Sequence, residues 1–259
     1  MKQLLLALLL LAWPSPGFAA ATLLNTNAAI SSTSSTTLSG AQTVNAGGTN
    51  VVAVAHVMFQ IEQGHAPPTV SAITYGGVAM TSAGTAEEEA GSHNWSTQIF
   101  TLVAPSTGSN TLAITVSAAV TPEAIIADIA AFQGVDQTTP VRSGSHTVAA
   151  GQTPNPQITV PSATGDIVTT VFTNRTSATP TTSQTLIQNG VSEPTGTNFA
   201  DDYGAGSASV TVTWTVANAD YSITGVSLQA ASVGAKLQTK SSNGKLFSLT
   251  GGTGALQVK

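Results

Sequence analysis

Apolar and polar residues alternate along much of the chain. Residues 209–216 place valine or tryptophan at every even position and serine or threonine at every odd one, and leucine, isoleucine and valine recur at positions 112, 114 and 116. Consecutive side chains of a strand point to opposite faces of a sheet, so this period of two predicts strands with one buried and one exposed face.

Residues 51–62 are apolar on both faces of such a strand. One face carries Ala53, Ala55 and other apolar residues, and the other carries Val54, His56 and Met58. A run that is apolar on both faces predicts a central strand covered on both sides. We therefore expect His56 to be a hydrogen-bonded, partly buried residue.

Residues 121–132, TPEAIIADIAAF, allow two interpretations. The proline, glutamate and alanines could open a helix, but the isoleucines and the stop at Gly134 favour a buried strand, which we predict. Gly134, Asp136 and Pro140 then form the turn that follows it, because a short acidic side chain can bond its own backbone there and proline cannot donate to a ladder.

Clusters of glycine, proline and asparagine separate the apolar segments at short intervals, and no sustained apolar pattern has helical spacing after the first twenty residues. Many short strands punctuated in this way predict an all-β fold: a two-sheet antiparallel β-sandwich of the jelly-roll kind, over residues 21–232.

The tail, residues 233–259, carries a hairpin signal. Asn243-Gly244 separates residues 237–240 from residues 245–249, and this dipeptide favours a two-residue turn between antiparallel strands. A two-stranded ribbon is marginally stable by itself. We expect it to dock on its own sandwich or on a neighbouring copy; a flexible terminus is the alternative.

Residues 1–20 are predicted to be a signal peptide. Lys2 precedes an unbroken apolar run over residues 4–13, and small residues follow at positions 19–21. We expect a mature chain that is secreted or held at the cell surface and has no transmembrane segment. Its lack of cysteine excludes disulfides, so stability must come from the core.

Charge is sparse and uneven. Charged residues make up 7% of the chain, against about 25% in ordinary globular proteins. All twelve carboxylates lie within residues 21–231 beside Arg142 and Arg175, whereas the tail has four lysines and no acid. An acidic body does not suit nucleic-acid binding, but attraction between tail and body, in one molecule or between two, fits this pattern.

Several segments resemble, in the same order, blocks of a β-sandwich module found in secreted bacterial and metagenomic proteins. They include VSAITYGGVAMTSAG, TQIFTLVAPSTGSNTLAITVS, AAFQGVDQTTPV, ITVPSATGDIVTTVF and ASVTVTWTVANADYSITGVSLQAA. The resemblance covers roughly residues 22–231, through turn and core motifs. It implies a β-sandwich, here in one copy, and it carries over no activity and no site residue.

The sequence contains no nucleophile elbow, phosphate loop or dinucleotide motif. Its four histidines lack the close spacing of zinc ligands, so we do not expect a transition-metal site. Paired carboxylates remain possible: Asp128 and Glu62 could serve a jelly-roll glycoside hydrolase or polysaccharide lyase. We expect Asp128 to face water instead, and the acidic run at residues 87–89 to be a solvated loop.

Two binding sites are considered. Asp201 and Asp202, in the glycine-rich segment NFADDYGAG, could hold a structural calcium ion, with a plain turn as the alternative. Trp95 beside polar residues, with Tyr75 and Tyr203, could form an aromatic platform for extracellular polysaccharide. No catalytic residue and no other cofactor is assigned.

Together these observations predict a secreted, non-catalytic β-sandwich with a structural, adhesive or assembly role at the cell surface or in the extracellular space. Self-association through the hairpin is the expected partner interaction. A carbohydrate-binding module is the alternative, followed by the hydrolase or lyase.

Overall fold

The computed structural model describes residues 20–62, 64–66, 68–90, 93–143, 147–175, 179–192, 197–217, 219–232, 236–240 and 246–250. The predicted signal peptide, except Ala20, lies outside the described residues. The chain divides into two compact units: residues 20–231 form one, and residues 1–19 together with residues 232–259 form the other.

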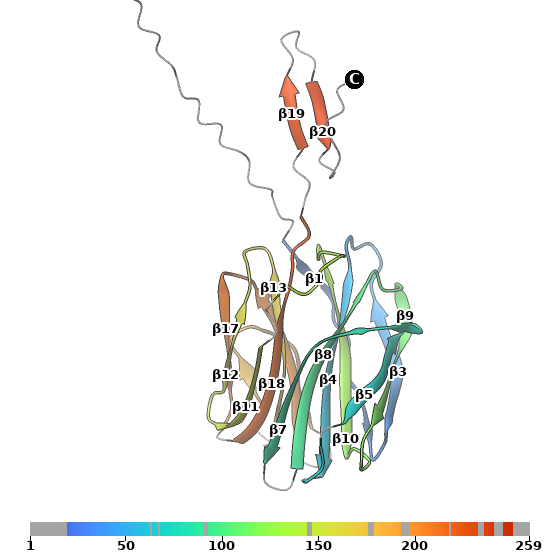
Figure 1. The fold of residues 1–259 in the computed structure, drawn as a ribbon, viewed down its shortest axis with the longest axis vertical. Coiled ribbons are helices and arrows are strands. Elements are labelled where there is room, and N and C mark those ends of the chain that lie inside the picture. Colours follow the sequence, from blue (N-terminus) through green and yellow to red (C-terminus); the bar gives the residue numbers. More distant parts are fainter. Residues whose placement is uncertain are drawn as a thin grey trace, which may run out of the picture. The chain divides into compact units, whose positions relative to one another are not determined.

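Every regular element in the described residues is a strand (Figure 1), so they contain no helix that could cross a membrane. The strands are β1 (Thr22–Asn25), β2 (Ile30–Thr33), β3 (Thr37–Val44), β4 (Val52–Glu62), β5 (Thr69–Tyr75), β6 (Val78–Ala79), β7 (Thr81–Ala90), β8 (His93–Val103), β9 (Gly108–Ser117), β10 (Ala124–Gln133), β11 (Thr147–Thr153), β12 (Gln157–Pro161), β13 (Ile167–Asn174), β14 (Thr181–Thr182), β15 (Thr185–Ser192), β16 (Asn198–Ala205), β17 (Ser209–Thr215), β18 (Ala219–Leu228), β19 (Lys236–Lys240) and β20 (Leu246–Thr250).

Within the described part of residues 20–231, the strands form four antiparallel sheets. The first outer sheet has the order β3-β9-β5-β6, and the first inner sheet has the order β1-β10-β4-β8-β7, with β2 also on β10. The second inner sheet is β11-β18-β13-β16-β15, and the second outer sheet is β12-β17-β14. The all-β antiparallel sandwich predicted from the sequence is thus confirmed.

The pairing is nested, and the same nesting occurs twice. β1 pairs with β10, β3 with β9, β4 with β8 and β5 with β6. Further along the chain, β11 pairs with β18, β12 with β17 and β13 with β16. Nested pairing of early with late strands defines a jelly roll. Strands β1–β10 form a first jelly roll, and strands β11–β18 form a second one with the corresponding strand order.

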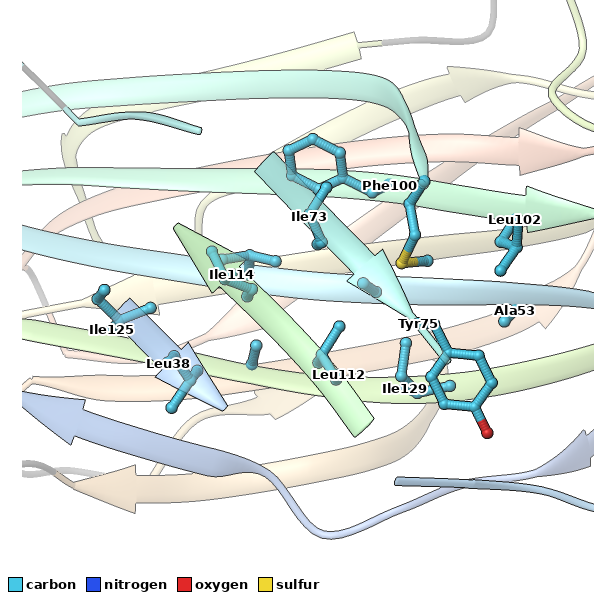
Figure 2. Packing of buried hydrophobic residues seen from close by; sticks show 14 of the residues in the cluster. Leu38, Ala53, Ile73, Tyr75, Phe100, Leu102, Leu112, Ile114, Ile125 and Ile129 are labelled. Carbon is cyan, nitrogen blue, oxygen red and sulfur yellow. The ribbon is translucent and has the colours of Figure 1, made fainter. Parts of the chain in front are cut away.

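Three apolar layers hold these sheets together. The first core fills the space between the first outer and first inner sheets (Figure 2), the central core joins the two inner sheets, and the third core joins the second inner and outer sheets. The first core includes Leu38, Ala53, Ile73, Tyr75, Phe100, Leu102, Leu112, Ile114, Ile125 and Ile129. In Figure 1 the sheets accordingly lie as successive layers, from β3 and β9 to β12 and β17.

The inner strands are covered on both faces. Residues 52–61 of β4 are all buried, with Ala53 and Ala55 in the first core and Val54 and Met58 in the central core. This confirms the central strand predicted from the two apolar faces of the segment. In β17 the alternation is one-sided: Val212 and Trp214 are buried and Ser209 is exposed.

The segment that allowed either a helix or a strand is a strand, as predicted. Residues 124–133 form β10, which pairs with β4 over most of its length. The turn after it is also confirmed: the Asp136 Oδ1 accepts the backbone N–H groups of Thr138 and Thr139, each at 2.8 Å. These two bonds lower the pKa of Asp136. Gly134 has a φ of 72°, which favours glycine.

The acidic run at residues 87–89 was expected in a loop, and this expectation is wrong. The run lies in β7, where Glu87 faces Ser96 and Glu88 faces Trp95 in the register with β8. An antiparallel ladder is made by backbone groups, and the eleven residues of β8 continue the hairpin through the charged positions.

The predicted hairpin in the tail is present. β19 pairs with β20 in antiparallel register, with Leu237 opposite Leu249 and Thr239 opposite Phe247. These two strands form a sheet of their own among the described residues.

The third core is organised by stacked aromatic rings. The rings of Phe172 and Trp214 lie nearly parallel, with centroids 4.8 Å apart. The rings of Phe172 and Tyr221 are also stacked, with centroids 6.5 Å apart. The Trp214 Nε1 donates to the Thr170 hydroxyl at 3.2 Å. Trp214 therefore anchors the second outer sheet to the second inner sheet.

We expect Trp214→Ala to lower the free energy of unfolding by about 3–5 kcal/mol, because it opens a cavity between these sheets. Urea denaturation followed by circular dichroism measures the loss. Thr211→Ala, on the same strand and outside the third core, is the matched control and should change stability by no more than about 0.5 kcal/mol. Equal effects of the two substitutions would contradict the packing described here.

A second anchor is ionic. Asp166 accepts bonds from the Arg142 guanidinium at 2.5 and 2.9 Å, from the Ser227 hydroxyl at 3.0 Å and from the Ala230 N–H at 3.0 Å. Burial would raise the pKa of Asp166, but the bonds from Arg142, Ala230 and Ser227 outweigh it and lower that pKa. The carboxylate joins the loop before β13, the end of β18 and the segment after β10.

Replacing the Asp166 carboxylate should lower the free energy of unfolding only at pH values where the carboxylate is ionised. Its pKa is lower in the folded state, so its contribution is present above the unfolded pKa of about 3.9 and is lost as the pH falls through the folded pKa. We expect Asp166→Asn to cost about 1.5–3 kcal/mol at neutral pH. Urea unfolding of both proteins from about pH 7 to pH 2 measures the gap, which should shrink below about pH 4; a constant gap would argue against an ionised Asp166.

Candidate functional site

One cluster of titratable side chains lies between the two inner sheets. It consists of His56 from β4, Asp128 from β10 and Asp201 from β16, and the exposed fraction of each is 0%. One donor atom from each residue lies within 4.8 Å of the other two. The cluster combines residues of both jelly rolls.

Strand register brings these residues together. His56 lies directly opposite Asp128 in the pairing of β4 with β10. Asp201 lies opposite Val171, a residue of the central core, in the pairing of β16 with β13. Opposed residues of an antiparallel pair share a face, so Asp201 points into the same interface as Val171.

Both carboxylates contact the same nitrogen of the histidine. The His56 Nδ1 lies 3.1 Å from the Asp128 Oδ1 and 2.8 Å from the Asp201 Oδ2. A positive imidazole ring, or another cation at this position, would be attracted to both acids.

The other ring nitrogen has a fixed role. The His56 Nε2 lies 2.9 Å from the Thr169 hydroxyl oxygen, and that hydroxyl donates its proton to the Asp202 carbonyl at 2.7 Å. Because its only proton is used, the Thr169 oxygen must accept from His56. The Nε2 atom therefore carries a proton, and the Nδ1 atom is the one that faces the carboxylates.

The environment shifts the pKa values strongly. Burial alone would lower the pKa of His56, but the adjacent Asp201 and Asp128 raise it to about 10. Burial, with the charge of Asp128 beside it, raises the pKa of Asp201 well above its ordinary value. In the absence of other ligands, the ring is therefore charged at neutral pH, and the raised pKa of Asp201 favours its protonated form.

Two buried carboxylate oxygens in the cluster, the Asp128 Oδ2 and the Asp201 Oδ1, accept no hydrogen bond from an N–H or hydroxyl group. A third, the Asp201 Oδ2, has only its ionic contact with the His56 Nδ1. A buried polar atom without a partner is costly. The cluster therefore has unused capacity to bind a proton or a metal ion, whereas its burial keeps it away from any substrate in solvent.

The first jelly roll supplies the histidine, and the second has an apolar residue at the corresponding place. His56 is the fifth residue of β4, and Val171 is the fifth residue of β13. In the first jelly roll, His56 lies opposite Asp128 of β10 and opposite Ile99 of β8. At the corresponding place in the second, Val171 lies opposite Thr224 of β18 and opposite Asp201 of β16. The histidine is therefore not a requirement of the jelly-roll fold.

Polar groups continue along the interface beside the cluster. The Thr97 hydroxyl lies 2.9 Å from the Ser222 hydroxyl and 3.1 Å from the Thr224 hydroxyl. The Thr197 hydroxyl donates to the Gln60 Oε1 at 2.6 Å. These bonds also link the first jelly roll to the second, so the central core is held by both apolar and polar contacts.

The carboxylate pair considered for glycoside hydrolysis is not brought together. Asp128 is buried rather than facing water, which corrects that expectation, and it lies opposite His56. Glu62 is exposed at the end of β4, six residues further on. At about 3.3 Å per residue the two are roughly 20 Å apart along the strand, too far for a pair that needs about 5–10 Å.

The calcium site proposed at Asp201 and Asp202 is also not formed by these two residues. Both are buried within β16 rather than in a loop. Consecutive strand residues point to opposite faces: Asp201 faces His56, whereas Asp202 accepts from the Thr170 hydroxyl at 2.7 Å and from the Thr182 hydroxyl. Burial raises the pKa of Asp202 to about 6, against these two bonds, which lower it.

The three aromatic residues proposed for carbohydrate binding lie in different places. Trp95 is 1% exposed and its Nε1 donates to the Thr197 hydroxyl at 3.3 Å. Tyr75 is fully buried in the first core. Tyr203 is half-buried and meets the ring of Phe132 edge-on, with centroids 6.1 Å apart. The exposed platform expected from Trp95 and Tyr75 is therefore not present.

Among the described residues, no other histidine belongs to this cluster. His65 is half-buried in the connection after β4, and His93 begins β8. His146 lies outside the described residues.

Comparison of the chain with family models, with curated proteins and with solved structures gave no match. The all-β fold that the resemblance implied is present, whereas membership of a module of secreted bacterial proteins stays a prediction.

We expect Thr169→Val to lower the free energy of unfolding by about 1–3 kcal/mol, since it leaves the buried His56 Nε2–H without a partner. The substitution keeps the shape of the side chain. Thr159→Val, on the exposed face of β12, is the matched control and should change stability by less than about 0.5 kcal/mol. Guanidinium denaturation compares the two; equal effects would show that the bond to His56 has no special weight.

Proposed function

We propose that this protein is an exported, non-catalytic structural component that assembles with copies of itself through its C-terminal hairpin. The observation that carries the proposal is the pairing of β19 with β20 in a sheet of their own. The signal-like pattern of residues 1–20 and the resemblance of residues 22–231 to modules of secreted proteins support the extracellular location.

A two-stranded sheet has two open edges. Each edge presents backbone N–H and C=O groups that need partners, and such edges add readily to another sheet. The ribbon is also too small to be stable without further contacts. A hairpin of this kind therefore favours strand addition to a neighbour.

The charges indicate which surface the hairpin meets. Lys236, Lys240 and Lys245 belong to the tail, which contains no acid, whereas all carboxylates belong to residues 21–231. The densest acidic run, residues 87–89, lies in β7, and β7 is the last strand of the first inner sheet. We therefore assign the partner as β7 of a second copy of this chain.

This assignment predicts that the mature chain, starting at residue 21, forms species larger than a monomer, and that removing residues 233–259 leaves a monomer. Light scattering coupled to size-exclusion chromatography measures the mass. Because the contact is electrostatic in part, raising the salt concentration to about 0.5 M should shift the full chain toward monomer.

Charge exchange gives the matched control. Lys236→Glu with Lys240→Glu should weaken assembly, and adding Glu87→Lys with Glu89→Lys should restore it, because the attraction is re-formed with opposite signs. A monomeric full chain would refute assembly. Assembly without charge rescue would refute β7 as the partner.

A further inference from the structure

The distances in the buried cluster match those between neighbouring ligands of one metal ion. The His56 Nδ1 is 2.8 Å from the Asp201 Oδ2 and 3.1 Å from the Asp128 Oδ1. Two ligands about 2.1 Å from a metal lie roughly 3.0 Å apart at right angles and about 3.4 Å apart in a tetrahedron. Small side-chain shifts would thus place an ion within reach of all three.

The histidine is held as metal-binding histidines are. A ligating imidazole commonly donates its second N–H to an acceptor, which fixes its tautomer and orientation. Here the Nε2–H is donated to Thr169, which is itself fixed by the Asp202 carbonyl. The remaining nitrogen, Nδ1, is the atom that faces the two acids.

The unpartnered oxygens supply a second, independent observation. The Asp128 Oδ2 and the Asp201 Oδ1 are buried and accept no hydrogen bond from an N–H or hydroxyl group, so a proton shared between the two acids is their one alternative to an ion. With a neutral imidazole, two ionised carboxylates leave a charge that one divalent ion would balance. The same oxygens would also complete its coordination where no water reaches.

We propose that His56, Asp128 and Asp201 bind one divalent transition-metal ion, of which Zn²⁺ is the best fit. Imidazole nitrogen suits zinc, iron, copper and nickel, whereas calcium and magnesium take oxygen ligands. Closed sites of low coordination number are typical of structural zinc. This site goes beyond the proposed assembly role and does not depend on it.

The ion would join the two jelly rolls. His56 and Asp128 belong to the first, and Asp201 belongs to the second. A metal bound by both halves stabilises only the folded arrangement, because the ligands are far apart in the unfolded chain. In a protein without cysteine, it would supply the cross-link that disulfides provide elsewhere.

Protons are the competing occupants. One proton on the His56 Nδ1 and one on Asp201 would satisfy the same charges without a metal. The experiment must therefore separate a metal-bound from a protonated cluster.

The mature chain, without an affinity tag, is first unfolded in guanidinium that contains a chelator. The guanidinium and the chelator are then removed, and the chain is refolded with or without equimolar Zn²⁺. After washing with chelator, elemental analysis should find about one zinc per chain in the first sample. Its Tm should be about 5–10 °C higher than that of the metal-free sample. Because the three ligand side chains are buried, zinc can reach them only when the folded protein opens locally. Native metal-free protein should therefore take up zinc far more slowly than refolding protein.

Asp201→Asn should abolish zinc retention. Asp202→Asn is the matched control, because Asp202 is the next residue of β16, is equally buried and points to the opposite face; it should retain zinc. If a variant does not fold, X-ray absorption of the zinc-loaded wild-type chain decides: one nitrogen and at least two oxygen ligands at about 2.0–2.2 Å are expected.

Three results would overturn the proposal. The first is refolded wild-type protein that holds less than about a tenth of an equivalent of zinc, which would show a protonated cluster. The second is zinc that the chelator removes at once from folded protein, which would show binding outside the buried cluster. The third is equal retention by the Asp201→Asn and Asp202→Asn variants.

Discussion

The face-to-face packing of the two inner sheets is the constraint on which the rest of the structure depends. Each inner sheet is already covered on its other side by an outer sheet, so its central strands have no face left for water. Every side chain in the central interface must then be apolar or must find a partner there. This explains why β4, β10 and β13 are almost wholly buried, and why polar residues such as His56 and Thr169 are hydrogen-bonded there.

Local sequence patterns are sufficient to predict several of the elements but not their arrangement. The two apolar faces of residues 51–62, the turn at Asp136 and the hairpin around residues 243–244 are each decided by residues close in the chain. The repetition of the jelly roll and the contact between inner sheets depend on pairings between distant strands, which periodicity does not encode. A sandwich of residues 21–232 was predicted, but its doubling was not.

The same limit applies to the buried cluster. His56 and Asp128 each interrupt an apolar segment of the sequence, but only the register of β4 with β10 makes them neighbours. Two acids before Tyr203-Gly204 resemble a calcium-binding turn, so the local sequence favours a loop at Asp201. β16 is instead a buried strand. Consecutive side chains of a strand point to opposite faces, so Asp201 and Asp202 have different partners. The polar sequence neighbours of Trp95 favour an exposed ring, but the ring is buried and its Nε1 donates to Thr197 of the second jelly roll.

The cluster is hard to explain as a device for stability alone. Replacing a buried ionic group by well-packed apolar residues is often neutral or stabilising, because desolvation offsets the attraction between the charges. The chain itself contains the apolar solution: Val171 occupies in β13 the place that His56 occupies in β4. A fold that accepts valine at one of two corresponding positions does not need histidine at the other. The combination of one imidazole, two acids and two unpartnered oxygens therefore favours a role in binding a cation over a role in packing.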